Sequence, residues 1–159
     1  MMNMKFYELP AEKQLRIINA GFEVFSQSEY KKASTEDISV KAEISKGLLF
    51  YYFHDKKSLY LFLFEYGANF IKDHVIDDYI FEITDFFELC AYAAERKVQM
   101  LQKSPFIMDF IMRAFYSQNE AVSDDVRKKV NDETAKIFAS YFSNIDYSNF
   151  RQDTNPKDI

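Results

Sequence analysis

A short stretch of the chain carries basic and hydroxyl side chains at spacings that could contact nucleic acid. Gly47 follows Lys46, the pair Tyr51 and Tyr52 comes about one helical turn later, and Lys56 follows them. Lysine can donate to base edges or neutralise phosphates, and tyrosine hydroxyls suit phosphate oxygens. Gly47 has no side chain, so the backbone there could approach a phosphate or a base edge closely.

Two short helices with a tight turn between them would position these side chains. Residues 34–42 fit the first helix, and residues 43–45 interrupt its pattern. Ser45 can cap a second helix over 46–53. Helix, short turn and helix is the helix-turn-helix pattern, whose second helix enters the major groove of DNA. Lys46 then stands at the groove-entering start of that helix.

The rest of the chain is predicted to be helical as well. Three Gly and three Pro are too few for the frequent turns of an all-β fold. We expect an all-α protein with a three-helix DNA-binding bundle over 1–54 and a helical domain over 55–159. Apolar and capping residues predict helices over about 10–26, 34–42, 46–53, 56–77, 82–102, 105–118 and 123–145.

Charge is distributed unevenly between the two predicted domains. The whole chain has a net charge of −5, which by itself argues mildly against nucleic-acid binding. Residues 1–60 hold nine Lys or Arg against eight Asp or Glu, whereas residues 61–159 hold 11 against 17. The acidity therefore belongs to the C-terminal part, and the segment of interest is locally basic.

Other chemistries find little support in the sequence. Cys90 is the single cysteine, which excludes an internal disulfide and a Cys-rich zinc site and fits a reducing cytoplasm. His54 is expected in a link, and His74 beside Asp73 and Asp77 fits a solvated acidic helix face better than a metal site. No phosphate loop, catalytic triad or zinc-protease motif is found, so we predict no enzyme, cofactor or metal. No apolar run reaches membrane length, and the start lacks a signal-peptide core, which predicts a cytoplasmic protein.

Residues 44–59, ISKGLLFYYFHDKKSL, resemble the DNA-binding domain of the TetR family of transcriptional regulators. That family typically reads Val-Ser-Lys-Gly-Thr-Leu-Tyr-His-Tyr-Phe, then a short polar link and a Lys. The resemblance extends from Pro10 to about Tyr66. It implies a two-domain helical repressor that binds operator DNA as a homodimer and is released by a small-molecule effector in the C-terminal domain.

The resemblance also assigns residues to roles in this sequence. Core positions fall on Phe25, Ile38, Ile44, Leu49 and Phe53. The implied DNA contacts are Thr35, Lys46, Gly47, Leu48, Tyr51, Tyr52 and Lys56.

Three positions depart from the family pattern. Leu48 replaces the usual Thr and could offer only apolar contact, for example to a thymine methyl. Phe50 replaces a Tyr and lacks its hydroxyl. Glu43 replaces the usual turn Gly; its backbone would be strained at positive φ, and its charge would repel a phosphate. These departures keep open an alternative, a helical small-molecule-binding or interaction module that no longer binds DNA.

Aromatic residues make up 18% of the chain. Two explanations stay open, a compositional preference for Phe and Tyr at core positions and an aromatic-lined cavity for a hydrophobic effector. The TetR family commonly has longer chains, so either its last helices are missing here or residues 123–145 serve in dimerisation. The candidate pocket residues are Phe86, Leu89, Met108, Met112, Phe115 and Tyr116.

Overall fold

The computed structural model describes residues 4–116, 122–130, 140, 142–148 and 150–151. Every regular element in these residues is a helix, which confirms the all-α fold class. None of the described helices is both long and apolar enough to span a lipid bilayer. In chain order the elements are η1 (Met4–Phe6), α1 (Ala11–Gln27), α2 (Thr35–Lys41), α3 (Lys46–Phe53), α4 (Lys56–Val75), η2 (Asp78–Phe81), α5 (Phe86–Lys103), α6 (Ile107–Tyr116) and α7 (Ser123–Val130).

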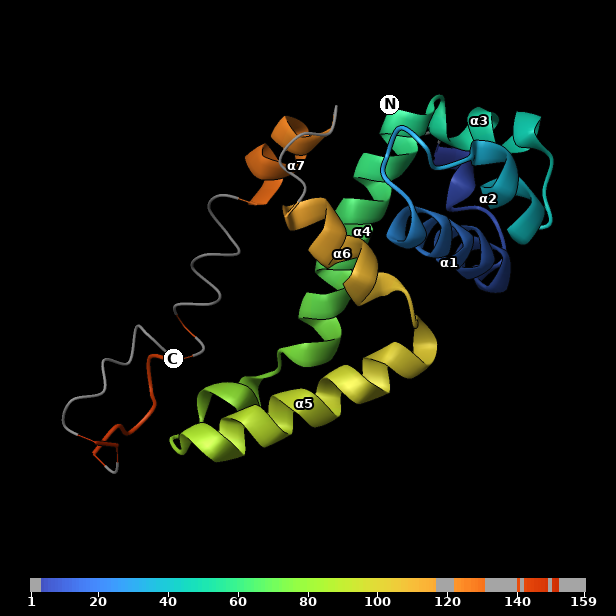
Figure 1. Ribbon diagram of the computed structural model, residues 1–159. Coiled ribbons are helices and arrows are strands. Elements are labelled where there is room, and N and C mark those ends of the chain that lie inside the picture. Colours follow the sequence, from blue (N-terminus) through green and yellow to red (C-terminus); the bar gives the residue numbers. More distant parts are fainter. Residues whose placement is uncertain (1–3, 117–121, 131–139, 141, 149, 152–159) are drawn as a thin grey trace.

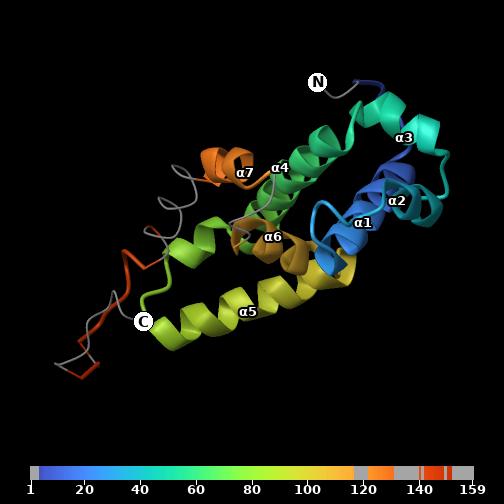
Figure 2. The same ribbon diagram turned by 45° about the horizontal axis from the view of Figure 1, so that its top comes forward.

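The long helix α4 links two groups of helices (Figure 1). Helices α1, α2 and α3 gather at one end of α4, while α5 runs back from its other end toward α1 (Figure 2). There the Ser104 hydroxyl donates to the Asn19 side-chain oxygen at 2.7 Å. Helix α6 packs against both α1 and α4. The N-terminal helices are therefore held by α4, α5 and α6 together.

Side-chain caps fix where the helices of the N-terminal part begin. The Ser34 hydroxyl accepts from the Asp37 N–H at 3.2 Å, which starts α2. Ser45 caps α3 in the same way, at 3.1 Å from its third residue, and the Asp55 carboxylate caps α4 at 2.6 Å from the Ser58 nitrogen. Each cap satisfies a backbone donor that has no partner inside its helix. Sequence predicted all three caps, and the structure confirms them.

The C-terminal helices differ more from the prediction. Helix α5 starts four residues later than expected, because the Asp85 carboxylate caps it and accepts from the Glu88 N–H at 2.8 Å. Of the expected helix 123–145, the segment α7 (Ser123–Val130) and the single residue Ser140 are described as helix. Residues 131–139 lie outside the described residues, and 142–148 form turns and irregular backbone.

One aromatic core runs through both predicted domains. Phe25 of α1 and Phe110 of α6 are fully buried, and both contact the Tyr60 ring of α4, with centroids 4.9 and 5.1 Å away. The predicted core positions Ile38, Leu49 and Phe53 belong to the same cluster, with the half-buried Ile44 packed against it. The predicted division at 54/55 falls at the α3–α4 link, but the core continues across it.

Two glycines allow helices to cross closely. A Cβ added to Gly21 of α1 would lie 2.5 Å from Leu63 Cδ1 of α4. A Cβ added to Gly67 of α4 would lie 3.0 Å from Ile111 Cδ1 of α6. A side chain at Gly21 would therefore require Leu63 to move, whereas at Gly67 a methyl group would be a tight contact with Ile111.

We expect Gly21→Ala to lower the free energy of unfolding by about 1 kcal/mol, because overpacking outweighs the gain in helix propensity. Leu63 is fully buried and has little room to turn away from the new methyl group. Urea denaturation monitored by circular dichroism measures the change. A variant as stable as the wild type would show that the α1–α4 crossing tolerates a methyl group.

Candidate nucleic-acid interface

Helices α2 and α3 and their connection form a helix-turn-helix at one end of the molecule (Figure 2). The turn closes through backbone bonds, with the Glu43 N–H donating to the Val40 carbonyl at 3.1 Å and the Ile44 N–H to the Ser39 carbonyl at 3.0 Å. Ala42 ends α2 and Ser45 caps α3, so the geometry agrees with the sequence pattern.

Glu43 adopts the left-handed backbone conformation that the family usually gives to glycine. Its φ is 52°, so the turn does require the positive φ that strains a residue with a Cβ, at a cost of about 1 kcal/mol. Its carboxylate lies 3.1 Å from a terminal nitrogen of Arg16, and the Arg16 Nε donates to the Ala42 carbonyl at 2.9 Å. Arg16 of α1 thereby holds the turn and partly neutralises Glu43. Sequence reasoning missed Arg16, because nothing in the local motif points to a residue of another helix.

The start of α3 is the most accessible part of the motif. Lys46 and Gly47 are exposed, while Leu48 is half-buried and packs against the core. The Lys46 ammonium lies 3.3 Å from a carboxylate oxygen of Glu36 on α2. The predicted base-contacting lysine is therefore at the surface and already has an acidic neighbour.

Gly47 differs from the packing glycines. It is helical, and a Cβ added there would meet no atom closer than the Ser45 hydroxyl at 4.0 Å. Neither packing nor backbone conformation inside the chain requires a glycine at this position. The absence of a side chain instead leaves this part of α3 open to close approach from outside.

The two predicted tyrosines have different environments. Tyr51 is 49% exposed, whereas Tyr52 is 6% exposed and packs edge-on against the Phe6 ring at 5.8 Å. Tyr51 is therefore the surface hydroxyl of α3, and a DNA contact by Tyr52 stays a prediction. Thr35 is half-buried at the start of α2.

Lys56 begins α4, as predicted. Its ammonium lies 4.8 Å from the centroid of the Tyr30 ring and donates to the Lys31 carbonyl at 3.3 Å. Its neighbour Lys57 pairs with Asp125 of α7 at 2.8 Å. The hydrogen bond from Lys57 lowers the pKa of Asp125, and the same bond raises the pKa of Lys57. This pair ties the start of α4 to α7.

The six predicted pocket residues do not surround one cavity in the described part of the chain. Phe86 and Leu89 belong to a small cluster at the start of α5, and Met108 packs against the main core. On α6, Phe115 and Tyr116 are exposed. Sequence could not separate these environments, because all six positions share the same apolar helical spacing.

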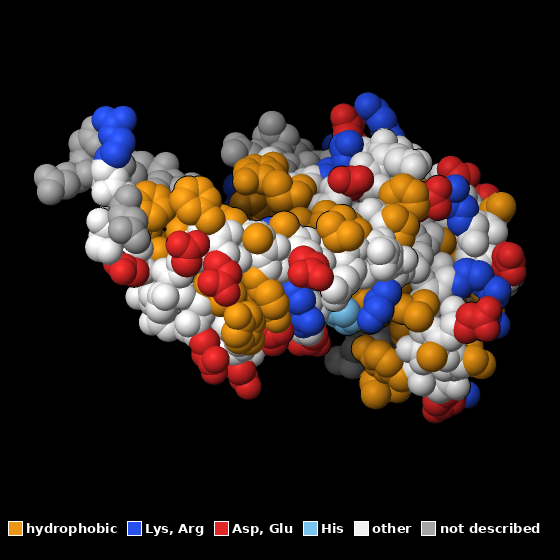
Figure 3. Space-filling view, turned by 90° about the horizontal axis from the view of Figure 1, so that it is seen from below, with side chains coloured by type: hydrophobic (Ala, Val, Ile, Leu, Met, Phe, Trp, Pro, Cys, Tyr) orange, Lys and Arg blue, Asp and Glu red, His pale blue; other side chains and the backbone are white. Residues whose placement is uncertain are grey.

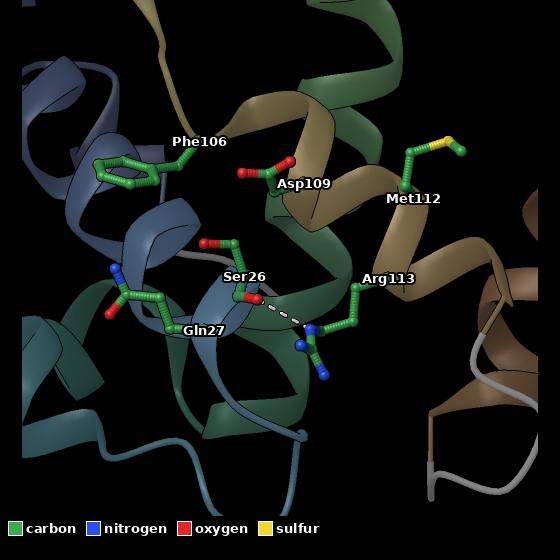
Figure 4. A pocket seen from close by; sticks show the side chains of 6 residues that line it. All are labelled: Ser26, Gln27, Phe106, Asp109, Met112 and Arg113. Atoms are coloured by element: carbon green, nitrogen blue, oxygen red, sulfur yellow. Dashed lines mark hydrogen bonds between the residues drawn. The ribbon is translucent and has the colours of Figure 1, made fainter.

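A surface hollow lies instead between the end of α1 and α6 (Figure 4). The Arg113 Nε donates across it to the Ser26 carbonyl at 2.8 Å. Met112 is the single predicted pocket residue that lines it. The lining residues are Ser26, Gln27, Phe106, Asp109, Met112 and Arg113.

The face seen in Figure 3 mixes exposed apolar, acidic and basic side chains. On α5, Phe87 and Val98 are exposed.

Comparisons with known proteins agree with this geometry. Residues 17–62 match a family model described as bacterial regulatory proteins, tetR family. A TetR family transcriptional regulator from Chloroflexus aurantiacus J-10-fl superimposes with a TM-score of 0.62 and 24% identity, over 86% of this chain and 63% of that chain. A tetR-family regulator from Streptomyces coelicolor gives a TM-score of 0.54 and 16% identity, over 83% and 59%. No match was found among curated proteins.

The helix-turn-helix segment thus lies within the part of the chain that matches bacterial regulatory proteins of the tetR family. The match over residues 17–62 confirms the resemblance to the TetR family that was drawn from the sequence. The two solved structures support the same fold for the larger part of the chain. The chain spans about three fifths of the length of those two proteins.

We expect Gly47→Ala to separate stability from binding. The substitution should raise the free energy of unfolding by about 0.5 kcal/mol, because alanine favours a helix and meets open space. It should weaken binding to DNA by about tenfold, equivalent to about 1.4 kcal/mol, by obstructing close approach. Urea denaturation and fluorescence anisotropy with labelled DNA measure the two effects. Unchanged DNA affinity in a stabilised variant would remove Gly47 from the interface.

Proposed function

We propose that this chain is a sequence-specific DNA-binding transcriptional regulator that acts as a repressor, and not an enzyme. The observation that carries the proposal is the start of α3, where Lys46 is exposed and Gly47 is left open with no internal reason for a glycine. The family match over residues 17–62 supports it.

In the proposed complex α3 lies in the major groove. Lys46 donates to acceptors on base edges, and Leu48 offers apolar contact to a thymine methyl. Tyr51 donates its hydroxyl to a phosphate. Lys56 and Thr35, at the starts of α4 and α2, add phosphate contacts where helix N-termini favour anions.

We further propose that the regulator works as a homodimer in the cytoplasm. The support is the family resemblance of residues 17–62. A dimer of helix-turn-helix units reads two half-sites related by two-fold symmetry. The bound DNA would accordingly contain an inverted repeat.

Release of the DNA by a small hydrophobic effector is the last part of the proposal. A change in the C-terminal helices could reach the DNA-binding helices through α6, which packs on α1 and α4. The Arg113–Ser26 hydrogen bond and the Lys57–Asp125 ion pair would carry the same change. Of the effector contacts predicted from the sequence, Met112 lines the hollow between α1 and α6, whereas Phe86, Leu89, Met108, Phe115 and Tyr116 are not among its lining residues.

Selection of bound duplexes from a random library should enrich a short inverted repeat. Against that duplex, Lys56→Ala should reduce the slope of log affinity against log salt by about one per protomer and weaken binding to all sequences alike. Lys46→Ala should also relax the sequence preference, because its contacts are to bases. Anisotropy titrations at several salt concentrations measure both effects.

Failure to enrich any sequence, with no salt-dependent DNA binding, would contradict the proposal and favour the module that no longer binds DNA. Enrichment of a site without an inverted repeat would contradict the homodimer alone.

An effector should stabilise the protein against unfolding and lower its affinity for the selected duplex. A hydrophobic compound at about 100 times its Kd adds about 2.7 kcal/mol to the free energy of unfolding, which raises Tm. A thermal-shift screen of neutral, anionic and cationic hydrophobes, followed by anisotropy with the selected duplex, checks this. If stabilising compounds leave the DNA affinity unchanged, effector release is wrong.

A further inference from the structure

Five cations in and around the helix-turn-helix are held in ion pairs within the chain. Arg16 and Lys46 pair with acids of the motif itself, and the other pairs surround it. Their N–O distances lie between 2.7 and 3.3 Å. The five pairs are Arg16–Glu43, Lys32–Glu29, Lys41–Glu23, Lys46–Glu36 and Lys57–Asp125. In the N-terminal part of the chain, positive and negative side chains therefore lie next to one another, in agreement with its near-neutral net charge.

The Lys46–Glu36 pair stands at the point where α3 would enter the groove. Glu36 is the second residue of α2 and Lys46 is the first residue of α3. Their side chains are 61% and 50% exposed, with the charged atoms 3.3 Å apart. The Glu36 carboxylate is favoured in the first turn of α2 by the helix dipole. Glu36 therefore lies on the predicted DNA-facing surface, next to the lysine that is predicted to contact bases.

We propose that Glu36 is a positioning residue that sets sequence specificity by holding Lys46 for base contact and withholding it from phosphates. The inference rests on the proposed DNA-binding function. A lysine ammonium has three N–H donors. One can stay with Glu36 while the other two reach acceptors such as O6 and N7 of guanine.

Binding to the selected sequence and binding to unrelated DNA affect the Lys46–Glu36 pair differently. At the selected sequence, Lys46 reaches the base without leaving Glu36, so the pair stays intact. On unrelated DNA no base acceptor matches Lys46, so it can contact only phosphates. While Lys46 stays paired with Glu36 the pair has no net charge, so full neutralisation of a phosphate requires Lys46 to leave Glu36. That exchange places an unpaired carboxylate beside the negatively charged backbone. Glu36 therefore weakens binding to unrelated DNA more than binding to the selected site.

The test compares wild type with Glu36→Gln on a random-sequence duplex and on the duplex that wild type selects. On the random duplex, the freed Lys46 should steepen the slope of log affinity against log salt by about 0.9 per bound protomer. The affinity gain over wild type should then be about 3.5-fold larger at 50 mM than at 200 mM salt for each protomer. On the selected duplex the slope should stay unchanged, so the ratio of selected to random affinity falls.

Two controls isolate the role of the pair. Asp124→Asn removes the same charge and breaks the 2.7 Å pair with Arg127 on α7, and should leave both slopes unchanged. In a Lys46→Gln background, adding Glu36→Gln should change the random-duplex slope by less than half as much, because no lysine is freed. Thermal melting verifies that each variant folds.

The outcomes separate the two proposals. Absence of DNA binding by wild type overturns both the proposed function and this inference. If wild type selects a site but Glu36→Gln changes neither slope, the inference alone is wrong. Equal affinity gains on both duplexes, or the same slope change without Lys46, would likewise overturn it and indicate general charge repulsion.

Discussion

The packing of one tyrosine holds helices α1, α2 and α3 to the rest of the chain. Tyr60, in the second turn of α4, contacts Phe25 of α1 and Phe110 of α6 edge-on and is 2% exposed. Protein interiors are close-packed, so none of these three helices can shift without the others. Helix α2 packs on α1, and Phe53 of α3 packs on Phe62 of α4. The orientation of the helix-turn-helix therefore depends on the same core as the C-terminal helices.

The three glycines illustrate how packing and binding requirements can be told apart. At Gly21 a Cβ would meet Leu63 at a distance that forces a shift, and at Gly67 it would make a tight contact with Ile111, so both glycines serve the packing of helices. Gly47 has open space around it and an ordinary helical backbone. A glycine that costs helix stability without serving the interior is explained most simply by a partner outside the chain.

In this protein the net charge says less about the helix-turn-helix than its individual ion pairs do. The net charge of −5 describes the C-terminal part more than the helix-turn-helix, where positive and negative groups nearly balance. Within that balance, Arg16 stabilises the strained turn at Glu43, whereas Glu36 lies beside the lysine that would contact bases. Pairs of the same chemical type thus have different consequences because they occupy different places on the surface.

The sequence by itself determined the local features: the caps at Ser34, Ser45 and Asp55, the helix-turn-helix and the family. These depend on hydrogen bonds and apolar spacing within a few residues, which the sequence states directly. Only the tertiary structure decided that Tyr52 is buried against Phe6, that Arg16 reaches the turn, and that the predicted pocket residues lie apart. Each of these follows from contacts between segments distant in the chain, for which helical periodicity gives a buried face but not the neighbour that covers it.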